Sequence, residues 1–292
     1  MTKPNGLGIF CSTHNLHADG LTVVAEGVEQ RGYQTLWYPE ALSYECFAMG
    51  GYLLSRTSSL QVASGIANIY ARDAVTSAQG YDSLNSMHAG RFMLGLGVSH
   101  VPLVEGARGH DYKKPVSTMR SYLAAMAQAN IDPTIRNQDR DVVLAALGPN
   151  MLSLSAEMTK GALPYCVTPE HTAEARAIMG PGSWLCVEQK VCMTSDEATA
   201  RRVAHQQMAR YMILDNYRNN WFRLGFTEAE VTGDGAPRFL DAMVAWGGDK
   251  RIRDVIEAHK RAGADQVVLQ MFRPDGGPGV DPRALDAFAP AG

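Results

Sequence analysis

The sequence predicts an α/β fold, a (β/α)8 TIM barrel in which eight parallel strands alternate with helices. The expected strands are continuous apolar runs, so both of their faces should be buried, as in a parallel sheet. A segment with helical periodicity follows each run, and right-handed crossovers between such units make the strands parallel. The chain of 292 residues suits one domain, residues 1–292, because these barrels need about 250 residues.

Eight apolar runs are the expected strands. In the third run, Leu60, Val62 and Ile66 are side chains typical of a strand inside a sheet. The eight runs are residues 6–10, 35–41, 60–66, 91–100, 141–148, 161–167, 184–193 and 265–272.

The helices between these strands carry apolar stripes at helical spacing, and several begin with a capping residue. Asp19 is the expected cap of a helix that ends at Gly32, and Asp73 is the expected cap of the helix after the third strand. Asp249 is the expected cap of a helix that ends at Gly263. Further helices are expected at residues 46–56, after Pro115, from Met151 onward and after Ser195.

Two segments depart from the regular alternation. Residues 131–140 are expected to form a polar connection, and residues 194–246 a helical excursion before the last strand. An open, doubly wound sheet is the alternative fold. The stretch GLGVSH, residues 95–100, argues against it, because the third glycine of a dinucleotide fingerprint is absent. Val101 and Pro102 also stand where the helix of that fingerprint should begin.

Composition excludes several classes of function. The formal charge of -3 gives no electrostatic case for a nucleic acid or an anionic membrane as a partner. No apolar run approaches the roughly 20 residues of a membrane span, and the first residues lack the apolar core of a signal peptide. The five cysteines are odd in number and include no C-x-x-C pair. We therefore expect a cytoplasmic protein with reduced thiols, no metal site and a small-molecule partner.

In a barrel of this kind the chemistry lies at the carboxyl ends of the strands. The turn LGPNM, residues 147–151, presents backbone amides beside the positive end of a helix dipole, where an anion can bind. An ordinary strand-to-helix turn is the alternative interpretation of the same residues. The candidate residues at the strand ends are Glu40, Gly65, Ile66, Asn68, Gly97, Ser99, His100, Gly148, Pro149, Asn150 and Met151.

Several stretches of the chain are similar to one known family. They are TLWYPEA, SGIANIYARDAV, GRFMLGLGVSHVPLVEGARGHDYKKPVSTMRSYL, VLAALGPNML and GALPYCVTPEHT. In this order they resemble the luciferase-like monooxygenase superfamily and, more narrowly, its actinobacterial branch of coenzyme F420-dependent oxidoreductases. The resemblance runs from Gly6 to about Phe272, which is nearly the whole chain.

The resemblance implies a location for each part of a flavin-like cofactor. Many members have a non-proline cis peptide at the end of the third strand, behind the flavin or deazaflavin ring, and Gly65-Ile66 occupies that position. An ordinary bend of small residues is the alternative. The family holds the phosphate of the cofactor tail at the turn that corresponds to residues 148–151. Thr168 and His171 are expected either to supplement that site or to cap the next helix.

The same resemblance gives the candidate catalytic residues. Glu40 aligns with an acidic residue that in relatives often contacts the deazaflavin ring. Several relatives have a catalytic histidine next to it, where this chain has Ala41, so their mechanism does not transfer directly. His100 stands where some relatives have a catalytic glutamate and is expected either to handle a proton or to hydrogen-bond the cofactor. His14, in the loop after the first strand, is either the next catalytic candidate or a surface histidine.

Together these features predict an oxidoreductase that transfers a hydride between C5 of coenzyme F420 and a small organic substrate. The alternatives are an FMN-dependent monooxygenase in the same barrel and a barrel that binds a flavin-like ligand without turnover. The family also implies a homodimer. The substrate and the direction of hydride transfer do not follow from the sequence.

Overall fold

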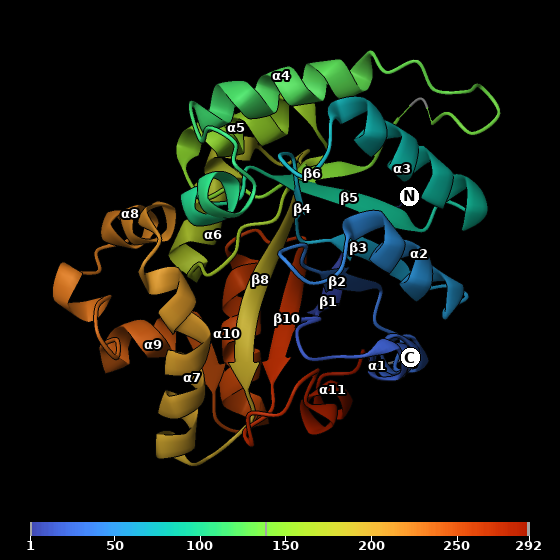
Figure 1. The fold of residues 1–292 in the computed structure, drawn as a ribbon. Helices are drawn as coiled ribbons and strands as arrows, with labels where there is room; N and C mark the ends of the chain where they lie inside the picture. The colour runs from blue at the N-terminus through green and yellow to red at the C-terminus, as the bar shows by residue number, and fades with distance from the viewer. Residues whose placement is uncertain (1, 138, 291–292) are drawn as a thin grey trace.

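A closed barrel of eight parallel strands forms the centre of the computed structural model, which describes residues 2–137 and 139–290. Strand β10 pairs with both β1 and β8, and this pairing closes the ring (Figure 1). The predicted barrel is therefore confirmed. Its strands are β1 (Gly6–Phe10), β2 (Thr35–Tyr38), β3 (Gln61–Ser64), β5 (Phe92–Gly97), β6 (Val142–Leu144), β7 (Gly161–Ala162), β8 (Trp184–Cys192) and β10 (Gln266–Phe272).

Helices surround the barrel and bury their apolar stripes against it. The largest apolar cluster lies between the outer side chains of the strands and the inner faces of these helices. A smaller cluster, which includes Phe10, Trp37 and Met93, fills the barrel interior. The surrounding helices are α1 (Ala18–Gln30), α2 (Cys46–Ser55), α3 (Ala74–Met87), α4 (Pro115–Ala127), α5 (Pro149–Met158), α6 (Pro169–Met179), α10 (Asp249–Arg261) and α11 (Pro282–Ala287).

Helix caps agree with the sequence in one case and differ in two. The Asp73 side chain accepts a hydrogen bond from the backbone amide of Thr76, so this predicted cap is confirmed. His17 stands at the N-cap of α1, and Asp19 lies in the first turn, where its charge still faces the positive end of the helix dipole. Gly248 is the N-cap of α10, and Asp249 is its first residue.

A short π-helix occupies Pro102–Ala107, where the sequence had argued against a helix. Pro102 lies at the start of this turn, where its missing N–H costs no hydrogen bond.

The predicted excursion 194–246 is confirmed as a helical insertion, and it contains a strand that the sequence did not predict. Its helices gather on one side of the barrel next to β8 (orange in Figure 1). They enclose a separate apolar cluster around Trp221 and Phe239. The elements of the insertion are α7 (Glu197–Met212), α8 (Asp215–Arg223), the 3-10 turn Glu228–Glu230, α9 (Pro237–Met243) and β9 (Val244–Trp246), which pairs with the end of β8.

The described residues contain no helix that is long and apolar enough to cross a membrane. Within the same residues, no group of three or more His, Cys, Asp or Glu side chains is arranged to hold a metal ion. All five cysteines are buried and free.

A buried histidine, His259, links α10 to α6 and to the barrel strand β8. His259 is fully buried, its Nδ1 lies 2.8 Å from the Thr172 hydroxyl, and its Nε2 lies 2.9 Å from Oε1 of Gln189. Oε1 can only accept, so Nε2 carries the proton and Nδ1 accepts from Thr172. Burial lowers the pKa of His259 to about 4.

We predict that the fold loses stability as the pH falls from about 6.5 to about 4. In this window the unfolded chain protonates His259 and the folded chain does not, so His259 lowers the free energy of unfolding by up to about 3 kcal/mol. Urea unfolding at several pH values should show this slope in the wild type and a shallower slope in His259→Gln. The exposed His17→Gln is the matched control, and equal slopes in wild type and His259→Gln would contradict the prediction.

Candidate active site

A cavity of about 560 Å³ opens at the carboxyl ends of the strands. Its lining comes from the segments after β1, β2, β3, β5, β6 and β7, from β10, and from the α7–α8 region of the insertion. Most of the lining surface is apolar and includes Phe10, Ile66 and Leu163, whereas Glu40, His100 and Arg210 are among the polar side chains that line it. The arrangement suits a largely apolar ligand that is oriented by hydrogen bonds.

The Gly65-Ile66 peptide bond is cis, as predicted, and both of its residues line this cavity. The backbone around it is tied to the neighbouring strands. The Gly65 amide donates to the carbonyl of Tyr38 at 2.7 Å, and the Glu40 amide donates to the carbonyl of Ile66 at 3.4 Å. Directly after the cis bond, the short strand β4 (Ala67–Asn68) pairs with the end of β5.

Two glycines make room for this conformation. A Cβ atom on Gly97 would lie 2.4 Å from Cδ1 of Ile66, so only glycine lets that side chain lie across β5. A Cβ atom on Gly65 would lie 2.7 Å from the Phe10 ring. Gly97 was expected to contact the cofactor, but it does not line the cavity, and its role is to support Ile66 from behind.

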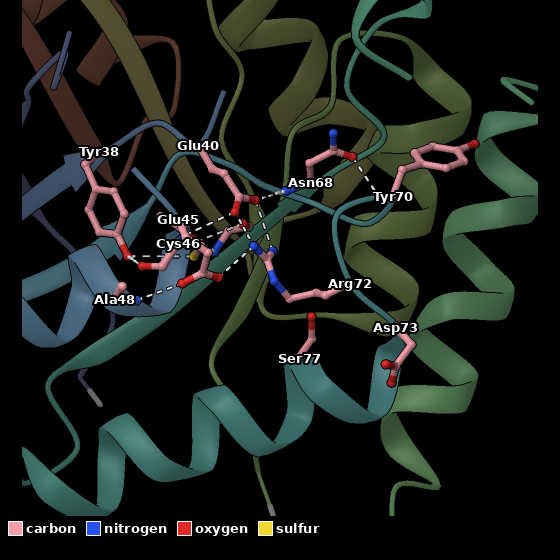
Figure 2. A network of polar contacts seen from close by, with 12 residues as sticks. Tyr38, Glu40, Glu45, Cys46, Ala48, Asn68, Tyr70, Arg72, Asp73 and Ser77 are labelled. Carbon is pink, nitrogen blue, oxygen red and sulfur yellow. Dashed lines mark hydrogen bonds and ion pairs between the residues drawn. The ribbon is translucent and has the colours of Figure 1, made fainter. Parts of the chain in front are cut away.

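Glu40 and Arg72 form an ion pair that joins the end of β2 to the segment after the cis bond (Figure 2). Their side chains are 3% and 7% exposed, respectively. The Glu40 carboxylate also accepts from the backbone amides of Asn68, at 2.8 Å, and Cys46, at 3.1 Å. Glu45, the N-cap of α2, accepts a second hydrogen bond from Arg72 at 2.8 Å.

The structure places Glu40 in the cavity lining and Asn68 outside it. Both carboxylate oxygens of Glu40 are engaged by Arg72 and by backbone amides, so Glu40 positions the chain, and its expected contact with the cofactor stays a prediction. The Asn68 side chain accepts from the Tyr70 amide at 2.9 Å and lies outside the cavity lining. Asn68 shapes the turn after the cis bond and does not reach the ligand space.

Ser99 and His100 line the cavity from the loop after β5. Ser99 has a left-handed backbone, with φ of 57°, which directs the chain across the end of the barrel. The His100 ring packs 5.5 Å from the Tyr217 ring, centroid to centroid. Burial lowers the pKa of His100, and a hydrogen bond with the Asn216 side chain opposes this shift, so the imidazole is neutral at pH 7.

His14 lies at the mouth of the cavity and is exposed. Ala41 and Leu42 line the same cavity after β2, and Leu42 is 68% exposed. Ala41 therefore presents only a methyl group to the cavity, where several relatives have a catalytic histidine. A proton-transferring side chain must come from another segment of the lining.

The turn between β6 and α5 has the form that the sequence predicted, with one correction. Gly148 is the N-cap of α5, and Pro149 is its first residue. The Met151 amide bonds to the Gly148 carbonyl at 3.1 Å, and its side chain belongs to the apolar core. Met151 is therefore a packing residue, and a ligand at this turn would meet Gly148 and Asn150 instead.

Arg223 of α8 supplies a cation at the β6–α5 turn that the sequence did not reveal. Its guanidinium donates to the Leu147 carbonyl at 3.2 Å and to the Asn220 side chain at 2.7 Å. A Cβ atom on Gly148 would lie 3.5 Å from Nη1 of Arg223. No local motif marks Arg223, because it reaches the turn from the insertion, 75 residues later in sequence.

Buried polar atoms without partners surround the same turn. His171 is fully buried and uses Nε2 to donate to the Leu147 carbonyl at 2.8 Å. Within residues 2–137 and 139–290, hydrogen-bond partners are lacking for Nδ1 of His171 and Nδ2 of Asn220. Thr168 is the N-cap of α6, and its side chain hydrogen-bonds Glu170. Buried polar atoms of this kind are normally satisfied, so their clustering at a helix N-terminus beside Arg223 fits a polar, anionic ligand group.

Comparison with known proteins agrees with this geometry. Residues 6–266 match the family model described as luciferase-like monooxygenase. The chain is 26% identical over 156 residues to a 5,10-methylenetetrahydromethanopterin reductase of Methanolobus tindarius, covering 48% of each protein. It is 24% identical over 226 residues to a putative coenzyme F420-dependent oxidoreductase of Mycobacterium tuberculosis, covering 63% of this chain and 65% of that one. The matched regions thus span about half and about two thirds of these relatives.

A solved structure shares the fold. An F420-dependent secondary alcohol dehydrogenase, in complex with an F420-acetone adduct, superposes with a TM-score of 0.79 at 13% identity, covering 98% of this chain and 97% of that one. This similarity concerns the fold alone. The family match covers most of the chain, and the chain belongs to the luciferase-like monooxygenase family.

Proposed function

We propose that the protein is a cytoplasmic oxidoreductase that uses coenzyme F420 to transfer a hydride to or from a small organic substrate. The observation that carries the proposal is the cavity at the carboxyl ends of the strands, which Ile66, Ala145 and Leu163 line with apolar surface and to which His100 contributes an imidazole. The F420-dependent relatives support the choice of cofactor. When bound, the deazaflavin would supply C5 as the hydride donor or acceptor.

The residues of the cavity fit the ring of such a cofactor. Ile66, Leu163 and Ala145 offer apolar contacts for a flat ring, and Gly65 keeps its backbone free of a side chain at the same place. The Glu40–Arg72 ion pair would hold this surface in position from behind. The protein would thus orient the ring and exclude water from one of its faces.

The β6–α5 turn fits the phosphate of the cofactor tail. Gly148 and the first turn of α5 present amides and the positive end of the helix dipole. Arg223 would add a positive charge, and the side-chain amide of Asn220 is a buried donor without a partner among the described residues.

His100 is our proposed proton-handling residue. Its ring lines the cavity, and its Nδ1 is buried without a partner among the described residues. The neutral imidazole would exchange a proton with a substrate oxygen or nitrogen.

The alternative within the same family is an FMN-dependent monooxygenase. FMN also carries a phosphate, so the β6–α5 turn alone does not separate the two cofactors. A reduced flavin reacts with dioxygen and the deazaflavin forms no comparable adduct, so oxygen consumption during turnover would favour FMN.

Our first prediction for this site concerns the tail. F420 should bind more tightly than FMN in a fluorescence titration, and Arg223→Met should weaken F420 binding about 10- to 100-fold, because a charge-assisted hydrogen bond contributes about 1.5–3 kcal/mol. Arg261→Met, at the exposed end of α10, is the matched control and should bind like the wild type. Equal dissociation constants for Arg223→Met and the wild type would place the phosphate elsewhere.

The second prediction concerns His100. His100→Asn retains hydrogen bonding but cannot pass on a proton, so the turnover of the F420-saturated enzyme should fall roughly 10²–10⁴-fold. F420 affinity should change little. Full turnover at saturation, together with weaker F420 binding, would instead make His100 a cofactor-positioning residue and leave the exposed His14 as the next candidate.

A further inference from the structure

One charged side chain of the cavity lining has no part in the proposed cofactor site. Arg210 lies in the last turn of α7 and lines the same cavity as Ile66 and His100. Its guanidinium carbon lies 5.6 Å from the centroid of the Tyr211 ring, which also lines the cavity. The positive charge of Arg210 therefore lies beside the part of the lining that the insertion tyrosines Tyr211 and Tyr217 form.

This positive charge has no counter-charge in the lining. Apart from the histidines, Glu40 and Arg210 are the acidic and basic side chains among the described residues of the lining, and Arg72 neutralises Glu40. Among the described residues Arg210 forms no ion pair, and its guanidinium donates to Oε1 of Gln207, one turn earlier on α7, at 3.1 Å. Arg201 of the same helix, by contrast, pairs with two carboxylates.

Two large apolar side chains near Arg210 are exposed at the edge of the cavity. Leu42 is 68% exposed and Ile213 is 78% exposed, and both line the cavity. Ile213 follows α7, three residues after Arg210 in sequence. Exposed apolar side chains that border a cavity are typical of a ligand-binding surface. A ligand at this edge would thus have an apolar part as well as a group that meets the arginine.

The two arginines that the insertion brings to the site serve different regions. Arg223 donates to the Leu147 carbonyl at the β6–α5 turn, and neither Arg223 nor Gly148 lines the cavity. Arg210 lines the cavity and has no contact with that turn among the hydrogen bonds of the described residues. The anion that Arg210 meets is therefore separate from the phosphate proposed for the turn.

We propose that Arg210 binds a carboxylate of the substrate, and that the substrate is a small, largely apolar carboxylate. The inference rests on the proposed function in that this ligand would share the cavity with the cofactor ring. A guanidinium can donate two parallel hydrogen bonds to one carboxylate, and Leu42 and Ile213 would cover the apolar body. A carboxylate neutralises the single charge of Arg210, whereas a phosphate dianion would leave a negative charge in a mostly apolar cavity.

The test compares benzoate with benzamide, which share one skeleton and differ in charge. Ligand-observed NMR titration of the full chain near neutral pH, with and without F420, should show benzoate binding about 5- to 10-fold more tightly, because a bidentate ion pair that stays partly solvated gives a modest gain. Arg210→Met should remove this preference. Arg202→Met, also exposed on α7 but outside the cavity lining, is the matched control and should keep it.

Salt provides a second measurement that needs no variant. Raising NaCl from about 0.02 M to about 0.5 M should reduce the preference of the wild type for benzoate, because salt screens the attraction between partly exposed charges. Melting curves check that each variant folds. A preference that survives in Arg210→Met, that is lost in Arg202→Met or that does not respond to salt would overturn the proposal.

The two proposals fail separately. An Arg210-dependent preference for benzoate in a protein that binds no F420 would refute the proposed cofactor and support the carboxylate site. F420 binding without any preference for benzoate would support the cofactor and refute the carboxylate site. Weaker F420 binding in Arg210→Met, with an unchanged preference for benzoate, would assign Arg210 to the cofactor and likewise refute the carboxylate site.

Discussion

The ion pair between Glu40 and Arg72 is the interaction on which the site depends. It connects the end of β2 to the segment that follows the cis Gly65-Ile66 peptide, and Figure 2 shows Glu40 facing both Arg72 and the Asn68 backbone. Replacing one member of such a pair leaves a nearly buried charge without its partner, which typically costs about 3–5 kcal/mol. The carboxylate also fixes two backbone amides, so one side chain orders three separate segments around the cavity.

The barrel and the insertion supply different parts of the site. The strand ends supply a rigid, largely apolar surface at Gly65 and Ile66, whereas the insertion supplies Arg223 and the tyrosines. The barrel thus offers a place for a flat ring, and the insertion covers its tail and faces the substrate. In such an arrangement, substitutions in the insertion can change the substrate specificity while the barrel keeps the binding site for the ring.

The sequence was sufficient for the barrel and for much of the strand-end geometry. Apolar runs and helical stripes predicted the eight strands, and the family resemblance predicted the cis bond at Gly65. The role of Gly97 was missed because a close contact with Ile66 has no signature along the chain. Arg223 and Tyr211 were missed because the insertion brings them to the cavity through tertiary packing, and neither lies in a recognisable motif. Glu40 was located correctly, but its partners come from distant segments, so its positioning role needed the structure.

The most direct test of this account measures unfolding free energy and F420 affinity in Glu40→Gln and in the double variant Glu40→Gln, Arg72→Met. The account predicts that the single variant loses about 3 kcal/mol of stability and binds F420 more weakly, because Arg72 is left without its carboxylate. The double variant, which removes both charges, should regain part of that stability. Unchanged stability and unchanged F420 affinity in Glu40→Gln, with loss of turnover alone, would contradict the account and make Glu40 a catalytic group.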